Sequence, residues 1–201
     1  MRSIPQAILE RSQSLKEGEV LAPKEFLHLG SRAAVDQAFC RLVKSGQMMR
    51  VARGIYVSPV RTNSRTRAPS VASVVKSVAA QGKHGISVDG ARSAKAVGLM
   101  KSTSGQEVYL TTGRSKQLVV GTRTVHLQHA PYWWFSLGST PAGDALRALA
   151  WMGEEQAEKS ARALRQRLAK AEWESLVSVR ASLPSWMAIA VGKTAMQDGV
   201  R

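Results

Sequence analysis

The chain has 201 residues, enough for one large domain or two small ones, and its 44% apolar content argues against disorder throughout. Its 29 Lys and Arg residues outnumber 14 Asp and Glu residues, and the resulting formal net charge of +15 favours a polyanionic partner. The sequence has no 18-residue apolar run, no secretory leader and a single cysteine, so we expect a cytoplasmic protein with no internal disulfide and no membrane association.

The first elements of the chain are short. Residues 3–15 carry apolar side chains at helical spacing and predict a helix. Residues 19–22 predict a short strand, and residues 23–28 predict a short helix that opens with proline. Gly30 supplies a turn before the next helix.

Residues 31–46 predict a second helix with a signal at each end. Ser31 can accept hydrogen bonds from first-turn N–H groups, and Gly46 can adopt the left-handed conformation that follows a helix. Apolar residues at three-and-four spacing predict one buried stripe, formed by Val35, Ala38, Phe39 and Leu42. The other face is polar and mostly basic, with Arg32, Asp36, Gln37, Cys40, Arg41 and Lys44.

A tight basic hairpin follows this helix. Residues 48–52 and 55–58 are β-prone runs on either side of Arg53-Gly54, and Pro59 ends the second run. A helix, a turn, a second helix and a basic hairpin in this order are typical of a winged helix-turn-helix. We interpret residues 1–60 as a DNA-binding domain; the alternative is an ordinary α+β segment with a solvated basic face.

The residue types suggest how such a domain would contact double-stranded DNA. Arginine pairs with guanine and glutamine with adenine in the major groove, so the candidates for base contacts are Arg32, Gln37 and Arg41. The candidates for phosphate contacts are Ser31, Lys44, Arg50, Arg53 and Tyr56, with the minor groove as an alternative for Arg53. Residues 61–68 predict a basic linker, in which Arg61, Arg65 and Arg67 could follow the DNA backbone.

Residues 69–201 predict a small mixed α/β domain with a helical C-terminus, so the overall class is α+β. The expected helices and strands are helix 70–82, strand 86–88, helix 90–100, strand 107–112, a hairpin of 117–120 with 124–128, and helices from 141 nearly to the end. We expect Trp151, Trp173 and Trp186 to pack this domain. The aromatic run 132–135 suits the core or a partner contact better than a base-stacking platform.

The chain carries no strong catalytic signature. It has no Gly-rich phosphate loop, no His-Glu-x-x-His helix and no Gly-x-Ser-x-Gly elbow, so we expect neither enzymatic activity nor a cofactor. His126 and His129 have no nearby ligand companion, so we expect no metal site, and Cys40 without a base suits packing. The carboxylates of Asp144, Glu154, Glu155 and Glu158 suit a solvated helix face; the alternative is a Mg²⁺-dependent nuclease or nucleotidyltransferase.

Two segments of the chain, residues 29–42 and 50–59, resemble the AbiEi family of type IV antitoxins, and more closely a short bacterial subgroup of that family. The similarity extends to residues 67–70, 109–115, 129–131 and 183–187. The resemblance implies a transcriptional autorepressor whose N-terminal winged helix binds inverted repeats in its own promoter. It also implies a C-terminal domain that antagonises a nucleotidyltransferase-fold toxin encoded alongside.

The chain departs from the family pattern in two ways. Phe39-Cys40 stands where the family has Leu-Ser, which changes the packing of the helix and leaves its reading face intact. The chain is also shorter than the better-known antitoxins, so a stand-alone regulator without a toxin partner is the alternative. We expect a monomer or a weak dimer in solution, with cooperative binding to DNA left open.

Overall fold

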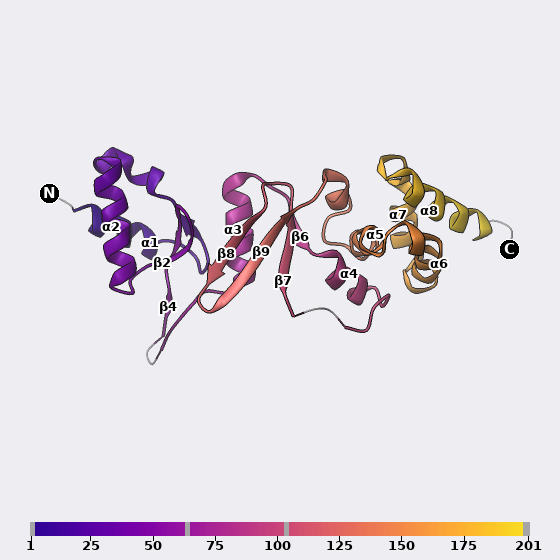
Figure 1. The fold of residues 1–201 in the computed structure, drawn as a ribbon, viewed down its shortest axis with the longest axis horizontal. Coiled ribbons are helices and arrows are strands. Elements are labelled where there is room, and N and C mark those ends of the chain that lie inside the picture. Colours follow the sequence, from indigo (N-terminus) through magenta and orange to yellow (C-terminus); the bar gives the residue numbers. More distant parts are fainter. Residues whose placement is uncertain (1–2, 63–64, 103–104, 199–201) are drawn as a thin grey trace. The chain divides into compact units, whose positions relative to one another are not determined.

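A computed structural model describes residues 3–62, 65–102 and 105–198 (Figure 1). Helices hold 54% of the residues and strands 17%, which confirms the α+β class. The chain divides into two compact units: residues 1–84 with 113–127, and residues 85–112 with 128–201. No helix in the described ranges has the length and apolar character needed to cross a membrane.

The first unit begins with the predicted order of short elements. They are α1 (Ile4–Gln13), β1 (Val20–Leu21), a 3-10 helix (Pro23–Leu29), α2 (Arg32–Lys44), β2 (Met49–Ala52), β3 (Ile55–Val57), β4 (Val60–Arg61), β5 (Thr66–Arg67), α3 (Val71–Gly82), β8 (Lys116–Val120) and the start of β9 (Arg123–His129). Strands β1, β3 and β2 form an antiparallel sheet in that order, so the short strand predicted near residue 20 is confirmed and pairs with the hairpin.

The buried stripe of α2 lies at the centre of the first unit's core, as its spacing predicts. Phe39 is fully buried, and its ring centroid lies 5.7 Å from that of Phe26 in a T-shaped pair and 4.4 Å from that of Tyr56. The same cluster contains Ile8, Leu21, Val35, Ala38, Leu42 and Met48. The helix α2 therefore has one face held by α1, the 3-10 helix and the sheet, and one face left to solvent.

Both predicted end signals of α2 are confirmed. The hydroxyl of Ser31 accepts from the Ala34 N–H at 3.2 Å. Gly46 has φ = 68°, and the N–H groups of Gly46 and Gln47 donate to the carbonyls of Val43 and Leu42. This left-handed turn ends the helix and directs the chain into β2, because a residue without Cβ adopts that conformation at little cost.

The expected basic linker at 61–68 differs in the structure. Val60 pairs with Arg67 and Arg61 with Thr66, so β4 and β5 form a small antiparallel hairpin. The carboxylate of Glu17 accepts from Arg67 Nη1 at 2.9 Å and Nη2 at 3.1 Å, and from the Ser70 N–H at 2.9 Å. Arg67 and Glu17 are 50 positions apart in the sequence. Their ion pair holds this segment against the first unit, so the segment is not the unpacked linker that the sequence predicts.

The structure also divides the chain differently from the expected boundary at residue 69. Helix α3 belongs to the first unit, where the Val20 N–H donates to Ser77 Oγ at 3.0 Å. The predicted hairpin of β8 and β9 is confirmed, with Leu118 opposite Val125, and β8 lies beside β2 in the same unit. These contacts join residues far apart in sequence, which local patterns do not reveal.

The second unit is mainly helical. Its elements are β6 (Ile86–Val88), α4 (Gly90–Ala96), β7 (Glu107–Thr111), the end of β9, a 3-10 helix (Tyr132–Phe135), α5 (Pro141–Met152), a short 3-10 turn (Glu154–Gln156), α6 (Ala157–Arg167), α7 (Lys170–Ser178), a second 3-10 turn (Arg180–Ser182) and α8 (Ser185–Asp198). Strands β6 and β7 are antiparallel, with Ser87 opposite Leu110.

The core of the second unit lies among α5, α6, α7 and α8. Leu146, Leu164, Leu176 and Met187 are fully buried there, one from each helix. The structure confirms that Trp173 and Trp186 pack this core, whereas Trp151 is 48% exposed at the end of α5.

Helix α4 ends at Ala96, four residues before the expected end at Met100. The Leu99 N–H donates to the Ala94 carbonyl at 2.8 Å and the Gly98 N–H to the Lys95 carbonyl at 3.0 Å. These two bonds satisfy the last carbonyl groups of the helix in a C-terminal capping turn, so the chain leaves the helical path early.

Candidate functional site

The solvent-facing side of α2 carries the predicted reading residues. Arg32, Gln37, Arg41 and Lys44 are exposed, and so is the capping residue Ser31. Their positions follow from the helical repeat, since the apolar positions between them face the core. The unit thus presents a rigid helix with three cations and one amide on its outer face.

The β2–β3 hairpin adds two exposed cations. Arg50 lies on β2 and Arg53 lies in the turn, where Gly54 has φ = 71°. Lys24, Arg32 and Gly54 line one small hollow of about 250 Å³, together with Ala22, Pro23 and Gln81. The start of α2 and the tip of the hairpin therefore lie beside each other.

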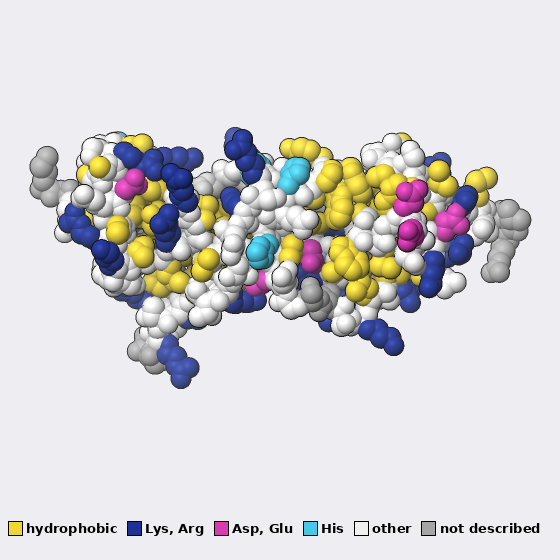
Figure 2. All heavy atoms as spheres, viewed as in Figure 1, with side chains coloured by type: hydrophobic (Ala, Val, Ile, Leu, Met, Phe, Trp, Pro, Cys, Tyr) yellow, Lys and Arg dark blue, Asp and Glu magenta, His cyan; other side chains and the backbone are white. Residues whose placement is uncertain are grey.

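We call the exposed residues Arg32, Gln37, Arg41, Lys44, Arg50 and Arg53 the basic surface. Figure 2 shows Lys and Arg side chains distributed over the N-terminal elements that carry it. Residues 1–67 hold 12 basic and 5 acidic residues, whereas residues 137–201 hold 9 and 7. The net positive charge is therefore larger in residues 1–67 than in the C-terminal helices, and a polyanion would be attracted more strongly to the N-terminal segment.

One acidic side chain lies on the same helix face. Asp36 Oδ2 accepts from Arg32 Nε at 2.9 Å, and the two side chains are 48% and 61% exposed. An exposed pair of this kind is worth at most about 1 kcal/mol because water and salt screen it. Sequence reasoning placed Asp36 on the outer face without assigning it a role; its position four residues after Arg32 is the signal that indicates the pair.

Tyr56 does not belong to the basic surface. It is only 8% exposed, and its ring packs against Phe39 in the core of the first unit. A phosphate contact needs a side chain that reaches solvent, so the expected role of Tyr56 is corrected to a structural one. The Arg-Gly-x-Tyr pattern does not distinguish these roles, because an amphipathic tyrosine suits either position.

The β4–β5 hairpin carries the remaining predicted cations. Arg61 and Arg65 are exposed, and the Thr62 N–H and hydroxyl donate to the Arg65 carbonyl at 2.9 and 3.0 Å. Arg67 instead donates to Glu17, and these hydrogen bonds hold the pKa of the Glu17 carboxyl below its ordinary value and raise the pKa of Arg67. Arg67 therefore anchors the hairpin and is not available as part of a free arm.

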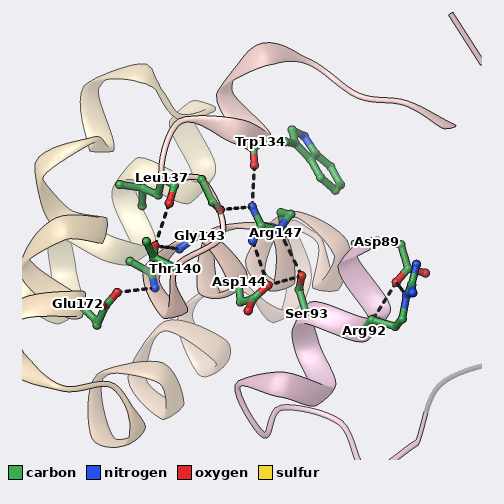
Figure 3. A network of polar contacts seen from close by, with 12 residues as sticks. Asp89, Arg92, Ser93, Trp134, Leu137, Thr140, Gly143, Asp144, Arg147 and Glu172 are labelled. Carbon is green, nitrogen blue, oxygen red and sulfur yellow. Dashed lines mark hydrogen bonds and ion pairs between the residues drawn. The ribbon is translucent and has the colours of Figure 1, made fainter. Parts of the chain in front are cut away.

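A second polar cluster lies inside the second unit, around Arg147 (Figure 3). Arg147 is 1% exposed, and its guanidinium donates to Asp144 Oδ1 at 2.9 Å and to the Gly138 and Trp134 carbonyls at 2.9 and 3.3 Å. Its Nε donates to Ser93 Oγ at 3.3 Å, and that hydroxyl donates to Asp144 Oδ1 at 2.9 Å. The cluster joins α4, α5 and the loop between residues 134 and 138.

The Arg147 cluster serves the fold, because protein groups satisfy the buried charge from several sides. Sequence reasoning placed Asp144 on a solvated face; the structure makes its side chain 27% exposed and binds it to two neighbours. The sequence did contain a signal for this ion pair, because Asp144 lies three residues before Arg147 on a predicted helix.

The other carboxylates are exposed, as expected of a solvated face. Glu158 Oε1 accepts from Lys193 at 2.6 Å, and this hydrogen bond holds the pKa of Glu158 below its ordinary value. Glu154 and Glu155 are also exposed. Across the described ranges, no cluster of three or more His, Cys, Asp or Glu residues is arranged to hold a metal ion.

The other singled-out residues have mixed environments. Tyr132 is 79% exposed, whereas Trp133 packs against the helical core, and its ring is tilted by 46° against that of Trp134 with 5.4 Å between the ring centroids. The aromatic run is thus partly core and partly surface. Cys40 is exposed on α2, so it does not pack the core.

Comparison with known proteins identifies a family. A model described as a family of unknown function, DUF6088, matches residues 7–176. The chain belongs to this family. The match runs from α1 to α7, so the DUF6088 region includes the basic surface and the Arg147 cluster. No curated protein and no solved structure matches the chain.

Proposed function

We propose that the first unit binds double-stranded DNA as a winged helix-turn-helix, with α2 as the recognition helix and the β2–β3 hairpin as the wing. The observation that carries the proposal is the exposed polar face of α2, which starts beside the tip of a hairpin bearing Arg53. An α-helix fits the major groove, and a neighbouring basic hairpin suits contact with the adjacent phosphates or minor groove.

The proposal assigns different contacts to different residues. Arg32, Gln37 and Arg41 read base edges, because their side chains can form paired hydrogen bonds with guanine or adenine. Contacts with phosphates come from Ser31, Lys44, Arg50 and Arg53, with Arg61 and Arg65 following the backbone. The exposure of all these side chains supports the assignment.

The resemblance to AbiEi-type antitoxins extends the proposal to regulation. The protein would repress its own promoter at inverted repeats and antagonise a nucleotidyltransferase-fold toxin through its second unit. A stand-alone regulator is the second candidate, favoured by the short chain. Both roles are binding roles without catalysis or cofactor. The engagement of Asp144 by Arg147 and Ser93 argues against the nuclease or nucleotidyltransferase alternative.

Fluorescence anisotropy with promoter DNA from upstream of the protein's own gene tests the DNA-binding role. Arg41→Ala should weaken binding by about 1–3 kcal/mol and relax base preference, whereas Arg61→Ala should weaken binding to all duplexes about equally. Lys170→Ala is the matched control, because it removes one exposed cation from α7 in the second unit. Equal affinity of wild type and both first-unit variants would contradict the proposal.

Co-expression with the neighbouring gene tests the antitoxin role. The full chain should restore growth if that gene encodes the toxin, and the Arg41→Ala, Arg53→Ala double variant should still restore it. This outcome would separate toxin antagonism from repression. Growth inhibition that the full chain fails to relieve would favour the stand-alone regulator.

A further inference from the structure

One acidic residue lies beside the basic surface, and its negative charge is unfavourable for a DNA contact. Asp36 is the single acidic residue of α2, it is 48% exposed, and it lies on the solvent-facing side of the helix one turn after Arg32. A carboxylate at this position repels the phosphates of a bound duplex. Its presence on a DNA-binding face therefore needs a compensating role.

Helix stability supplies only a small part of that role. Arg32 lies in the first turn of α2, where the helix dipole disfavours a cation, and Asp36 lies four residues further toward the C-terminus. This order is the less stabilising of the two possible orders of an i,i+4 ion pair. The exposure of both side chains weakens their attraction further.

The geometry of the pair points to a different role. The Arg32 Nε–H donates to Asp36 Oδ2 at 2.9 Å, which occupies one edge of the planar guanidinium. This contact uses the Nε–H, so the four Nη–H donors lie outside the ion pair. Two donors at the end of an arginine match the O6 and N7 acceptors of guanine.

We propose that Asp36 is a positioning residue that holds Arg32 so that its Nη groups read a guanine in the major groove. The proposal rests on the proposed DNA binding. Without Asp36, the long Arg32 side chain would be free to bind any nearby phosphate, which carries no sequence information. Asp36 therefore lowers general affinity for DNA and raises discrimination between sequences.

The test uses the full-length protein and a pool of randomised DNA duplexes. Wild type, Asp36→Ala, Asp36→Glu, Arg32→Ala and the double Ala variant each select a motif. Anisotropy then measures affinity for the wild-type motif, for the same motif with its guanine replaced by adenine, and for random duplex. Salt is varied between about 50 and 200 mM, the range over which phosphate contacts change affinity strongly.

We expect Asp36→Ala to lose up to about 5-fold of the preference for guanine, because the exposed pair that positions Arg32 is worth at most about 1 kcal/mol. Its affinity for random duplex should stay equal or rise, and its salt slope should steepen by about one if Arg32 gains a phosphate. Asp36→Glu should restore much of the preference, and the double variant should discriminate no worse than Arg32→Ala. A merely stabilising ion pair would move none of these quantities.

Two results would overturn the inference. If Asp36→Ala selects the wild-type motif with equal discrimination while Arg41→Ala weakens binding, DNA binding stands and the positioning role fails. If the wild type binds no duplex at all, both the proposed function and this inference fail. Circular dichroism spectra and melting curves of each variant exclude misfolding as the cause of a lost preference.

Discussion

The two units each contain an Arg–Asp pair on one helix, and the two pairs have the same N···O distance of 2.9 Å. In the first unit, Arg32 and Asp36 are 61% and 48% exposed; in the second, Arg147 and Asp144 are 1% and 27% exposed. Water and salt screen the first pair, whereas the second lies in a medium of lower polarity. The same two residue types therefore form a solvent-accessible pair in the first unit and a buried pair that stabilises the fold in the second unit.

Breaking the buried pair should have the largest effect. Arg147→Ala should lower the free energy of unfolding by about 3 kcal/mol, the lower end for a broken buried pair because Asp144 keeps some exposure. Urea denaturation measures this change. Arg147→Lys, which retains the charge without the planar fork, should fall between wild type and Arg147→Ala. A loss below about 1 kcal/mol for Arg147→Ala would show that the cluster is not structural.

Removing only the Ser93 hydroxyl should lower the free energy of unfolding by less than removing the Arg147 side chain. Ser93 is fully buried and contacts both Arg147 Nε and Asp144 Oδ1. Ser93→Ala should lower the free energy of unfolding by about 1–2 kcal/mol, because one buried donor loses its partner. Thermal melting of the Ser93→Ala and Arg147→Ala variants compares their losses of stability. A loss for Ser93→Ala as large as that for Arg147→Ala would contradict this prediction.

The exposed pair should barely affect stability. Arg32→Ala should change the free energy of unfolding by no more than about 0.5 kcal/mol, because both side chains are well solvated. The same variant should weaken promoter binding by about 1–3 kcal/mol if Arg32 reads a base. Urea denaturation and anisotropy on one preparation separate the two effects. A large stability loss without a binding loss would assign Arg32 to the fold.

The smallest expected effect concerns the pH dependence of a second exposed pair, Arg67 with Glu17. Arg67 and the Ser70 N–H hold the pKa of Glu17 below its ordinary value, so their contribution is complete above that ordinary value. The contribution is lost as pH falls through the lowered folded-state pKa, because protonated Glu17 no longer attracts Arg67. Glu17→Gln should therefore flatten this part of the acid dependence of melting temperature. Parallel acid titrations of wild type and variant would contradict this link.

Local sequence patterns predicted most elements of the first unit. The three-and-four spacing of Val35, Phe39 and Leu42 specified the buried face of α2, and Ser31 and Gly46 marked its ends. The exposure of Arg32, Gln37 and Arg41 followed from the same repeat. These features depend on neighbours within one or two helical turns, and such interactions are encoded in adjacent residues.

Only the tertiary structure decided which residues meet across long stretches of chain. Residue types alone did not reveal that Glu17 binds Arg67, that Tyr56 lies in the core, or that Ser93 bridges Arg147 and Asp144. Sequence by itself determined the amphipathic helix α2 and the basic hairpin, because hydrophobic periodicity and turn chemistry are local. The tertiary structure decided which charges are buried, because burial depends on residues that are distant in sequence. The surrounding protein in turn sets how strongly each ion pair is screened.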